Sequence, residues 1–173
     1  MASITALLHT ENDALRLGRA LETLYACDDI LIVDHGSRDA TARIAREYGA
    51  RVLDAMTEAS PGGYLRTAAA HSGRSRQSPS HGWILCLDPR ESLTEKLAAS
   101  LFEWKSESFH TQASAPPAFS VFLREETAQG WLQVPTAQTR LVPETWNVWN
   151  GSFPGHSSSA LALEGELLRF VFP

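Results

Sequence analysis

Short apolar runs alternate with helical patterns through the first part of the 173-residue chain. Apolar or β-branched runs, as in strands buried on both faces, occupy residues 4–9, 29–33, 51–53 and 83–87. Apolar residues recur at helical spacing within the segments 17–24, 40–48, 64–71 and 93–104. This alternation predicts an α/β fold, Rossmann-like, with a mostly parallel sheet and helices on both faces.

The pattern changes beyond residue 117, where the apolar segments become short and are separated by turns. Such segments predict strands without intervening helices. We therefore expect a single domain over residues 1–173, made of a strand-and-helix half over 1–105 and a short-stranded half over 118–173.

Composition narrows the classes of function. The formal net charge of −5 provides no basic field for a nucleic acid, so a nucleic-acid partner is not expected. No apolar run reaches the roughly 20 residues of a membrane-spanning helix, and the first residues do not resemble a secretory signal. Cys27 and Cys86 lie in apolar contexts and are expected to be core residues. These features favour a cytoplasmic protein.

Polar residues follow three of the predicted strands. Thr10, Asp34 and Asp88 each lie at or just past a strand end, and ligands of parallel α/β sheets bind at that edge. Asp34 can accept hydrogen bonds from a base or a ribose, or it can form a turn by bonding its own backbone, and the pattern does not separate the two. The sequence therefore predicts a site at this edge without fixing the role of each acid.

Asp88 and Glu91 flank Pro89-Arg90 after a buried strand. Closely spaced acids on such a turn can hold a divalent cation against a diphosphate. Spacing alone favours another interpretation, in which Glu91 is a first-turn acid of the following helix. Arg66 is a further candidate, since it can reach an anionic group, although an exposed helical arginine is usually only solvated.

The aromatic residues and the standard catalytic motifs indicate no further site in the sequence. Trp131, Trp146 and Trp149 could stack on a sugar, but the pattern favours core positions for them. The chain has no Gly-x-Gly-x-x-Gly after the first strand, no Gly-Lys-Ser/Thr loop and no Gly-x-Ser-x-Gly elbow. Dehydrogenases, NTPases and serine hydrolases are therefore disfavoured.

Several blocks occur in the order found in one known family. Residues 29–41, DILIVDHGSRDAT, are close to the block EIVVVDSGSTDGT, and residues 82–91, GWILCLDPRE, match DWILSLDADE. Residues 7–13, LLHTEND, resemble a strand followed by a Thr-Lys-Asn-Glu turn. On these blocks the chain resembles family-2 glycosyltransferases, particularly the bacterial lipopolysaccharide core branch. The resemblance implies a GT-A fold, with the first half binding a nucleotide sugar and the second lying on the acceptor side.

The resemblance also implies roles for individual residues. Thr10, Asn12 and Asp34 would lie at the nucleotide, with Thr10 and Asp34 bordering the base. Arg66 would contact base or phosphate, and Asp88 would touch ribose or metal. The donor would be a nucleotide-diphosphate sugar, a UDP-sugar in the first instance, bridged by a divalent cation, Mg²⁺ or Mn²⁺. The reaction would be inverting transfer in which a carboxylate takes the acceptor's proton. Relatives often act at the inner face of the membrane.

The chain departs from the family pattern at the metal motif and at the catalytic base. Arg90 replaces an acid of the family's DxD motif, and its positive charge opposes a cation that Asp88 and Glu91 would otherwise hold. Arg90 could instead pair with the diphosphate directly. The family's later acidic position falls near Pro154, where Glu144 and His156 are the nearby polar candidates.

These departures keep several interpretations open. A glycosyltransferase is the leading hypothesis, and a non-catalytic GT-A protein that has lost metal binding and serves in binding or assembly is the alternative. A metal-independent transferase that uses Arg90 is a third hypothesis. A nucleotidyltransferase is disfavoured because the Gly-rich start of those enzymes is absent.

Overall fold

The computed structural model describes residues 2–55, 61, 63–64, 82–106 and 117–172. Its first part contains β1 (Ser3–Thr10), α1 (Ala14–Glu22), the 3-10 turn η1 (Leu24–Ala26), β2 (Asp29–Asp34), α2 (Thr41–Glu47), β3 (Arg51–Asp54) and β4 (Gly82–Leu87). Its second part contains β5 (Glu91–Leu93), α4 (Glu95–Ser106), β6 (Phe119–Thr127), β7 (Gly130–Gln133), β8 (Gln138–Pro143), β9 (Trp149–Asn150), β10 (Phe153–Pro154) and β11 (Leu161–Arg169).

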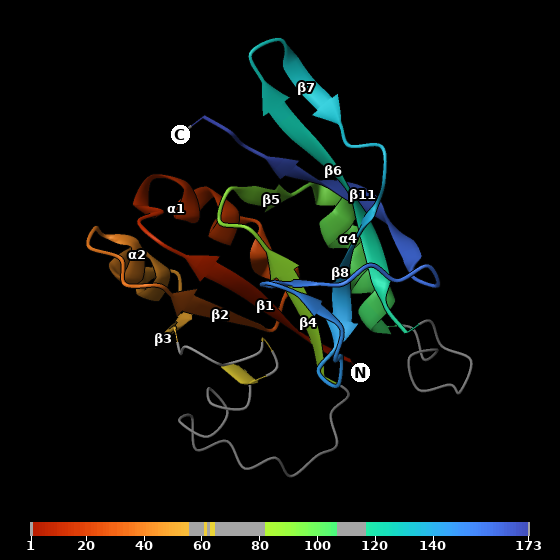
Figure 1. Cartoon of the computed structure of the whole chain (residues 1–173), viewed down its shortest axis with the longest axis horizontal. Helices are drawn as coiled ribbons and strands as arrows, with labels where there is room; N and C mark the ends of the chain where they lie inside the picture. The colour runs from red at the N-terminus through yellow and green to blue at the C-terminus, as the bar shows by residue number, and fades with distance from the viewer. Residues whose placement is uncertain (1, 56–60, 62, 65–81, 107–116, 173) are drawn as a thin grey trace.

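One sheet runs through both parts in the order β3-β2-β1-β4-β8-β6-β11-β5, with β7 paired to β6 (Figure 1). Strands β3, β2, β1 and β4 are parallel, as the apolar runs predict. Strand β8 joins this block antiparallel to β4, and β11 then runs parallel to β6. The parallel block places the ends of β1, β2 and β4 at one edge of the sheet.

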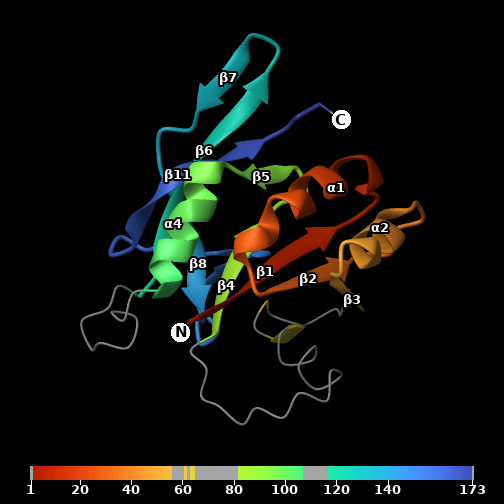
Figure 2. The same cartoon turned by 180° about the vertical axis from the view of Figure 1, so that it is seen from behind.

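The two faces of the parallel block are covered differently. One face carries Ile4, Ala6 and Leu8 of β1 in the larger core cluster, together with apolar residues of α1, α2 and α4. Figure 2 shows these three helices in front of the sheet. The other face packs against Tyr64, which has helical backbone, and against Trp146 in the segment around the β9–β10 hairpin.

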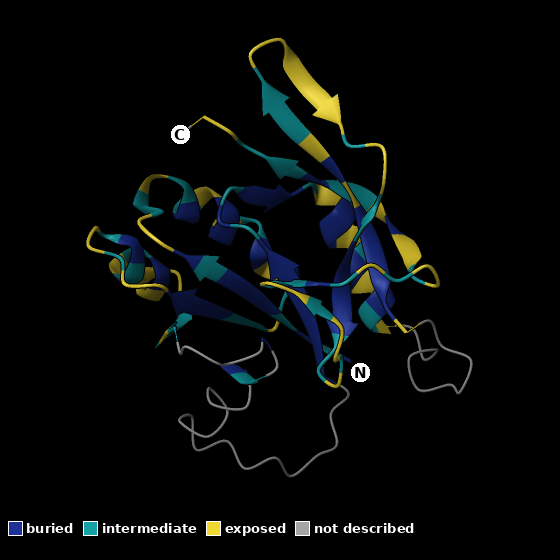
Figure 3. Cartoon of the chain, in the orientation of Figure 1, coloured by how far each residue is buried: buried dark blue, intermediate teal, exposed yellow. Residues whose placement is uncertain are grey.

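Burial follows the predicted pattern. Strands β1, β2, β4 and β8 are largely buried, whereas β7 is exposed along its length (Figure 3). Cys86 is buried and Cys27 packs partly buried against the core, and burial raises the pKa of both thiols to about 12. Both cysteines are therefore core residues without thiolate character.

Several details differ from expectation. Leu93 does not open a helix, because residues 91–93 form β5 against β11 and α4 begins at Glu95. Trp146 and Trp149 pack against the core, as favoured, but Trp131 is 45% exposed on β7 and meets the ring of Phe170. The helix expected after Tyr64 and the linker after Ser106 fall almost entirely outside the described residues. No described helix is long and apolar enough to cross a bilayer.

Candidate functional site

A pocket of about 420 Å³ opens at the carboxyl edge of the parallel block, where the sequence predicted a site. It is lined by His9, Thr10, Glu11, Asp13, Arg16, His35, Asp88, Pro89 and Arg90. These residues follow β1, β2 and β4 and include the start of α1. The topology therefore brings three of the predicted turns together, and we call this cavity the edge pocket.

Asp34 is held in a turn at the end of β2. Its carboxylate accepts hydrogen bonds from the Thr10 hydroxyl at 3.0 Å and from the N–H of Ser37 at 3.0 Å, and also from the Ser37 hydroxyl. Burial alone raises the pKa of this carboxyl, but the bonds from Ser37 and Thr10 outweigh it, so the net pKa is lowered. Of the two open interpretations, the structure shows the turn, and Asp34 itself does not line the pocket.

Asn12 fastens the turn after β1 to the turn after β2. It has a positive φ of 56°, which asparagine tolerates better than most residues. Its N–H donates to the Ser37 hydroxyl, and its side-chain oxygen accepts the N–H of Arg38, both at 2.9 Å. Asn12 therefore holds in place the turn that carries the pocket residues Glu11 and Asp13, and its side-chain oxygen is already hydrogen-bonded to Arg38.

His9 and His35 form a contact that the sequence patterns did not indicate. The Nδ1 of His9 lies 2.8 Å from the Nε2 of His35, so one ring donates a hydrogen bond to the other. The Nε2 of His9 is buried and has no hydrogen-bond partner among the described residues, and the His9 ring contacts that of Tyr64 edge-on. Burial, followed by the nearby His35, lowers the pKa of His9 to about 4. His9 is therefore neutral near pH 7 at the pocket wall.

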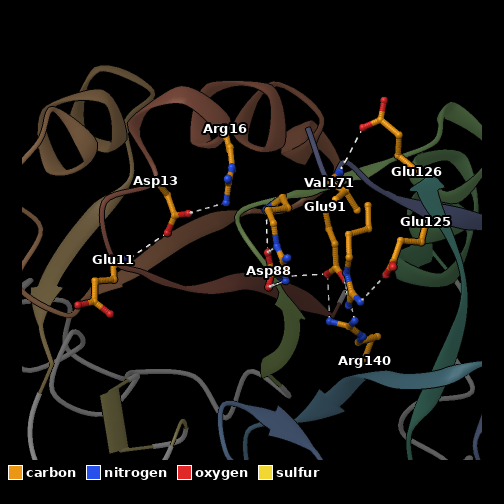
Figure 4. Close-up of polar contacts among 11 residues, drawn as sticks. Glu11, Asp13, Arg16, Asp88, Glu91, Glu125, Glu126, Arg140 and Val171 are labelled. Carbon is orange, nitrogen blue, oxygen red and sulfur yellow. Dashed lines mark hydrogen bonds and ion pairs between the residues drawn. The ribbon is translucent and has the colours of Figure 1, made fainter. Parts of the chain in front are cut away.

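Asp13 and Arg16 are also pocket residues that sequence reasoning did not select. Both belong to the start of α1, and their side chains lie 4.0 Å apart (Figure 4). Burial is the largest cause of the raised pKa of Asp13; the N–H of Glu11 opposes it, and the charge of Asp88 adds to it. Their position shortly after the first predicted strand is the feature of the sequence that could have indicated a place at the pocket.

Asp88 is paired with Arg90 on its own turn. Arg90 Nε lies 2.8 Å from one carboxylate oxygen and Nη2 lies 3.0 Å from the other, a bidentate geometry. The pair lowers the pKa of Asp88, outweighing the opposing effect of burial, and the hydrogen bond to Asp88 raises the pKa of Arg90. Arg90 spends two of its five N–H donors here and still lines the pocket.

Glu91 is neither a free metal ligand nor a first-turn helix acid, the two roles that its spacing suggests. Its side chain is fully buried, and its carboxylate accepts bonds from Arg140 at 2.8 and 3.1 Å and from Arg169 at 2.7 and 3.2 Å (Figure 4). It also accepts the N–H of Asp88 at 2.9 Å. Since α4 begins four residues later, Glu91 is not a first-turn acid, and it ties the β4 turn to β8 and β11.

These contacts decide whether the predicted acids fit a divalent cation. Both oxygens of Asp88 hold Arg90, and both oxygens of Glu91 hold arginines. Within the described ranges, no three His, Cys, Asp or Glu side chains are grouped to hold a metal ion. The residues do not fit a cation at Asp88 and Glu91.

The remaining candidates lie away from the edge pocket. Glu144 packs at Gly82, the first residue of β4, so it lies at the opposite edge of the sheet from Asp88 and cannot serve there as a base. His156 lines a second pocket instead. Arg66 lies outside the described residues.

Part of the chain is similar in sequence to a known glycosyltransferase. A 74-residue match, covering 41% of this chain, is 32% identical to a 4,4'-diaponeurosporenoate glycosyltransferase of Staphylococcus aureus strain bovine RF122 / ET3-1. Over those residues the chain is similar to a glycosyltransferase. The match spans 20% of the length of that relative, and the same protein of strain USA300 is 30% identical over the same length. No protein-family model matches this chain.

Two solved structures are similar to this chain at low sequence identity. A glucosyl-3-phosphoglycerate synthase of Mycobacterium tuberculosis, in complex with Mn²⁺, UDP and phosphoglyceric acid, is 15% identical with a TM-score of 0.44, covering 74% of this chain and 45% of that one. TarS 1–349 of S. aureus is 19% identical with a TM-score of 0.44, covering 78% and 38%. The ligands named belong to those proteins. The α/β fold with a mostly parallel block of strands, which the sequence predicts, is confirmed by the strand order.

Proposed function

We propose that this chain binds a nucleotide-diphosphate sugar, a UDP-sugar in the first instance, in the edge pocket and transfers the sugar to an acceptor with inversion. The observation that carries the proposal is the convergence of Thr10, His35 and Arg90 on one pocket at the carboxyl edge of a parallel sheet. The match to glycosyltransferases supports the chemistry. Thr10 and Asn12, with the Asp34 turn, would shape the base end.

Arg90 would provide positive charge at the diphosphate in place of a divalent cation. Two of its donors hold Asp88, so its orientation is fixed before ligand binds, and three donors remain for phosphate oxygens. Arg16 lies at the same pocket, and within the described part of the chain its ion pair is a 4.0 Å contact to Asp13. A guanidinium suits this task because it forms paired hydrogen bonds to phosphate.

The proposed transfer is a single displacement. The acceptor hydroxyl oxygen forms a bond to the anomeric carbon as the bond from that carbon to the diphosphate oxygen breaks, which inverts the configuration. The bonding electrons leave with the diphosphate, and a base takes the hydroxyl proton. Of the acids lining the edge pocket, Glu11 and Asp13 are not paired bidentately, and burial raises the pKa of Asp13, which we propose as the base.

A second candidate function is binding without catalysis. It is favoured by the occupation of Asp88 and Glu91 in ion pairs and by the position of Glu144 at the opposite edge of the sheet. A protein with these contacts could bind a nucleotide sugar and serve in assembly. The two functions differ in one result, the release of free nucleotide from bound donor.

Calorimetry with UDP- and GDP-sugars tests binding, and chromatography of the released nucleotide tests catalysis. We expect a UDP-sugar to bind and Arg90→Ala to weaken its binding at least about tenfold, since a charged hydrogen bond is lost. The control is Arg43→Ala, which removes an exposed arginine of α2. Binding without nucleotide release, with acceptor extracts present, would leave the non-catalytic function. No binding of any nucleotide sugar would contradict both functions.

A further inference from the structure

A second pocket, of about 400 Å³, lies against β8 and the β9–β10 hairpin. Its lining comprises Val134, Thr136, Ala137, Gln138, Thr139, Arg140, Asn150, Phe153, Pro154, His156 and Arg169. Among the described residues, the lining of this pocket contains two arginines and a histidine but no carboxylate. Glu91, which pairs with both arginines, is fully buried and does not line it. We call it the arginine pocket, and nothing in the proposed donor site uses it.

The cationic wall of this pocket is rigidly built. Arg140 is 2% exposed, donates to the carbonyl of Cys86 at 3.1 Å and to the side chain of Gln138 at 2.7 Å, and lies 4.3 Å from the ring centre of Phe153. Arg169 uses three donors on Glu91 and Glu125 and has two left. All four Nη hydrogens of Arg140 are used on Cys86, Gln138 and Glu91, so Arg140 contributes fixed positive charge to the wall, and Arg169 contributes the guanidinium donors for an anion.

The arginine pocket is connected to the edge pocket through one short turn. Arg140 and Arg169 hold Glu91, the Glu91 carboxylate accepts the N–H of Asp88, and Asp88 holds Arg90 at the edge pocket. The structure therefore places a second polar cavity next to the donor site, on the strands of the 118–173 half.

We infer that the arginine pocket binds an anionic group, phosphate or carboxylate, of the acceptor. This inference rests on the proposed function, since it names the class of acceptor for the same reaction. Hydroxyl and amide groups of Thr136 and Asn150 complete a lining that offers donors to an anion. An uncharged acceptor would leave these donors without the partner for which they are arranged.

The test is a titration of the chain with inorganic phosphate and, separately, with acetate, in which changes in NMR chemical shift report binding. The decisive variant is Gln138→Glu, which keeps an oxygen for Arg140 but adds a negative charge to the lining. The matched control is Gln129→Glu, with the same charge change at the exposed tip between β6 and β7. We expect saturable anion binding by the wild type, a loss of at least about tenfold in Gln138→Glu and no change in Gln129→Glu.

His156→Gln provides a second variant at an exposed position, so folding is not at risk, and we expect weaker anion binding there too. Tighter binding of phosphate or of acetate identifies the group. Absence of saturable binding of both anions, or equal binding by Gln138→Glu and Gln129→Glu, overturns the inference. UDP titrated into the same samples separates the two claims: anion binding that depends on Gln138 without UDP binding contradicts only the donor site.

Discussion

The turns after β2 and β4 begin from the same pattern, an aspartate after a buried strand, and end in different structures. Asp34 is satisfied by Thr10 on the adjacent strand and by Ser37 three residues on. Asp88, the aspartate of the second turn, is held by Arg90 two residues on, but Glu91 in the same turn is held by Arg140 and Arg169, 49 and 78 residues away. The first turn shapes a pocket locally, whereas the second joins the two halves of the sheet. The difference shows that a strand-end acid is not by itself a ligand site.

The largest test of this comparison is Glu91→Gln. Removal of the charge leaves Arg140 and Arg169 without their shared anion, with Arg140 almost fully buried, so the free energy of unfolding should fall by about 3–5 kcal/mol. Urea denaturation followed by tryptophan fluorescence measures it. Glu47→Gln, which breaks an exposed pair with Arg43, should cost less than about 0.5 kcal/mol. Equal losses in the two variants would contradict the joining role.

The His9–His35 pair predicts a pH dependence. Because the pKa of His9 is lowered to about 4, the unfolded chain binds a proton at His9 between pH 6.5 and 4 that the folded chain does not. Stability is therefore full above pH 6.5 and falls as pH drops toward 4, by about 3 kcal/mol in total.

Denaturation curves across this pH range check the effect. His9→Gln should remove most of the slope, and His156→Gln, at an exposed site, should retain it. The lowered pKa values of Asp34 and Asp88 act in a separate window, because their stabilisation is lost only as pH falls below about 4. A slope that His9→Gln leaves intact would show that His9 is not the titrating group.

The smallest effect is expected at the first turn. Asp34→Asn keeps the side-chain shape but exchanges one acceptor oxygen for an NH₂ group among the donors of Ser37 and Thr10, so unfolding should become easier by about 1–2 kcal/mol. The same denaturation assay measures it. A loss as large as that of Glu91→Gln would remove the distinction between a local and a joining turn.

The sequence was most informative where contacts are local or the pattern is periodic. The buried strands β1, β2 and β4, and the pocket at their carboxyl ends, follow from apolar runs and the right-handed connections between parallel strands. Gly49, directly after the C-cap residue of α2, has a positive φ of 78°, which is common for glycine at a helix end. These features depend on a few neighbouring residues, which a single sequence displays.

The sequence did not disclose contacts between distant segments. Glu91 was weighed as a metal ligand or a helix acid because nothing near it indicates Arg140 or Arg169. Arg140 lies in β8 directly before the apolar residues Leu141 and Val142, and a buried arginine there requires a buried acid, but the pattern does not say which. Leu93 was assigned to a helix for the same reason, since its pairing with β11 depends on a strand 74 residues later.

The most direct test of the central claim is the dissociation constant of a UDP-sugar measured with Mn²⁺ and with EDTA. In the proposed function, Arg90, oriented by Asp88, provides the positive charge at the diphosphate in place of a cation. This arrangement predicts that the two dissociation constants agree within about twofold. Binding that appears only with Mn²⁺ would contradict it and would require Asp88 to release Arg90 for a cation.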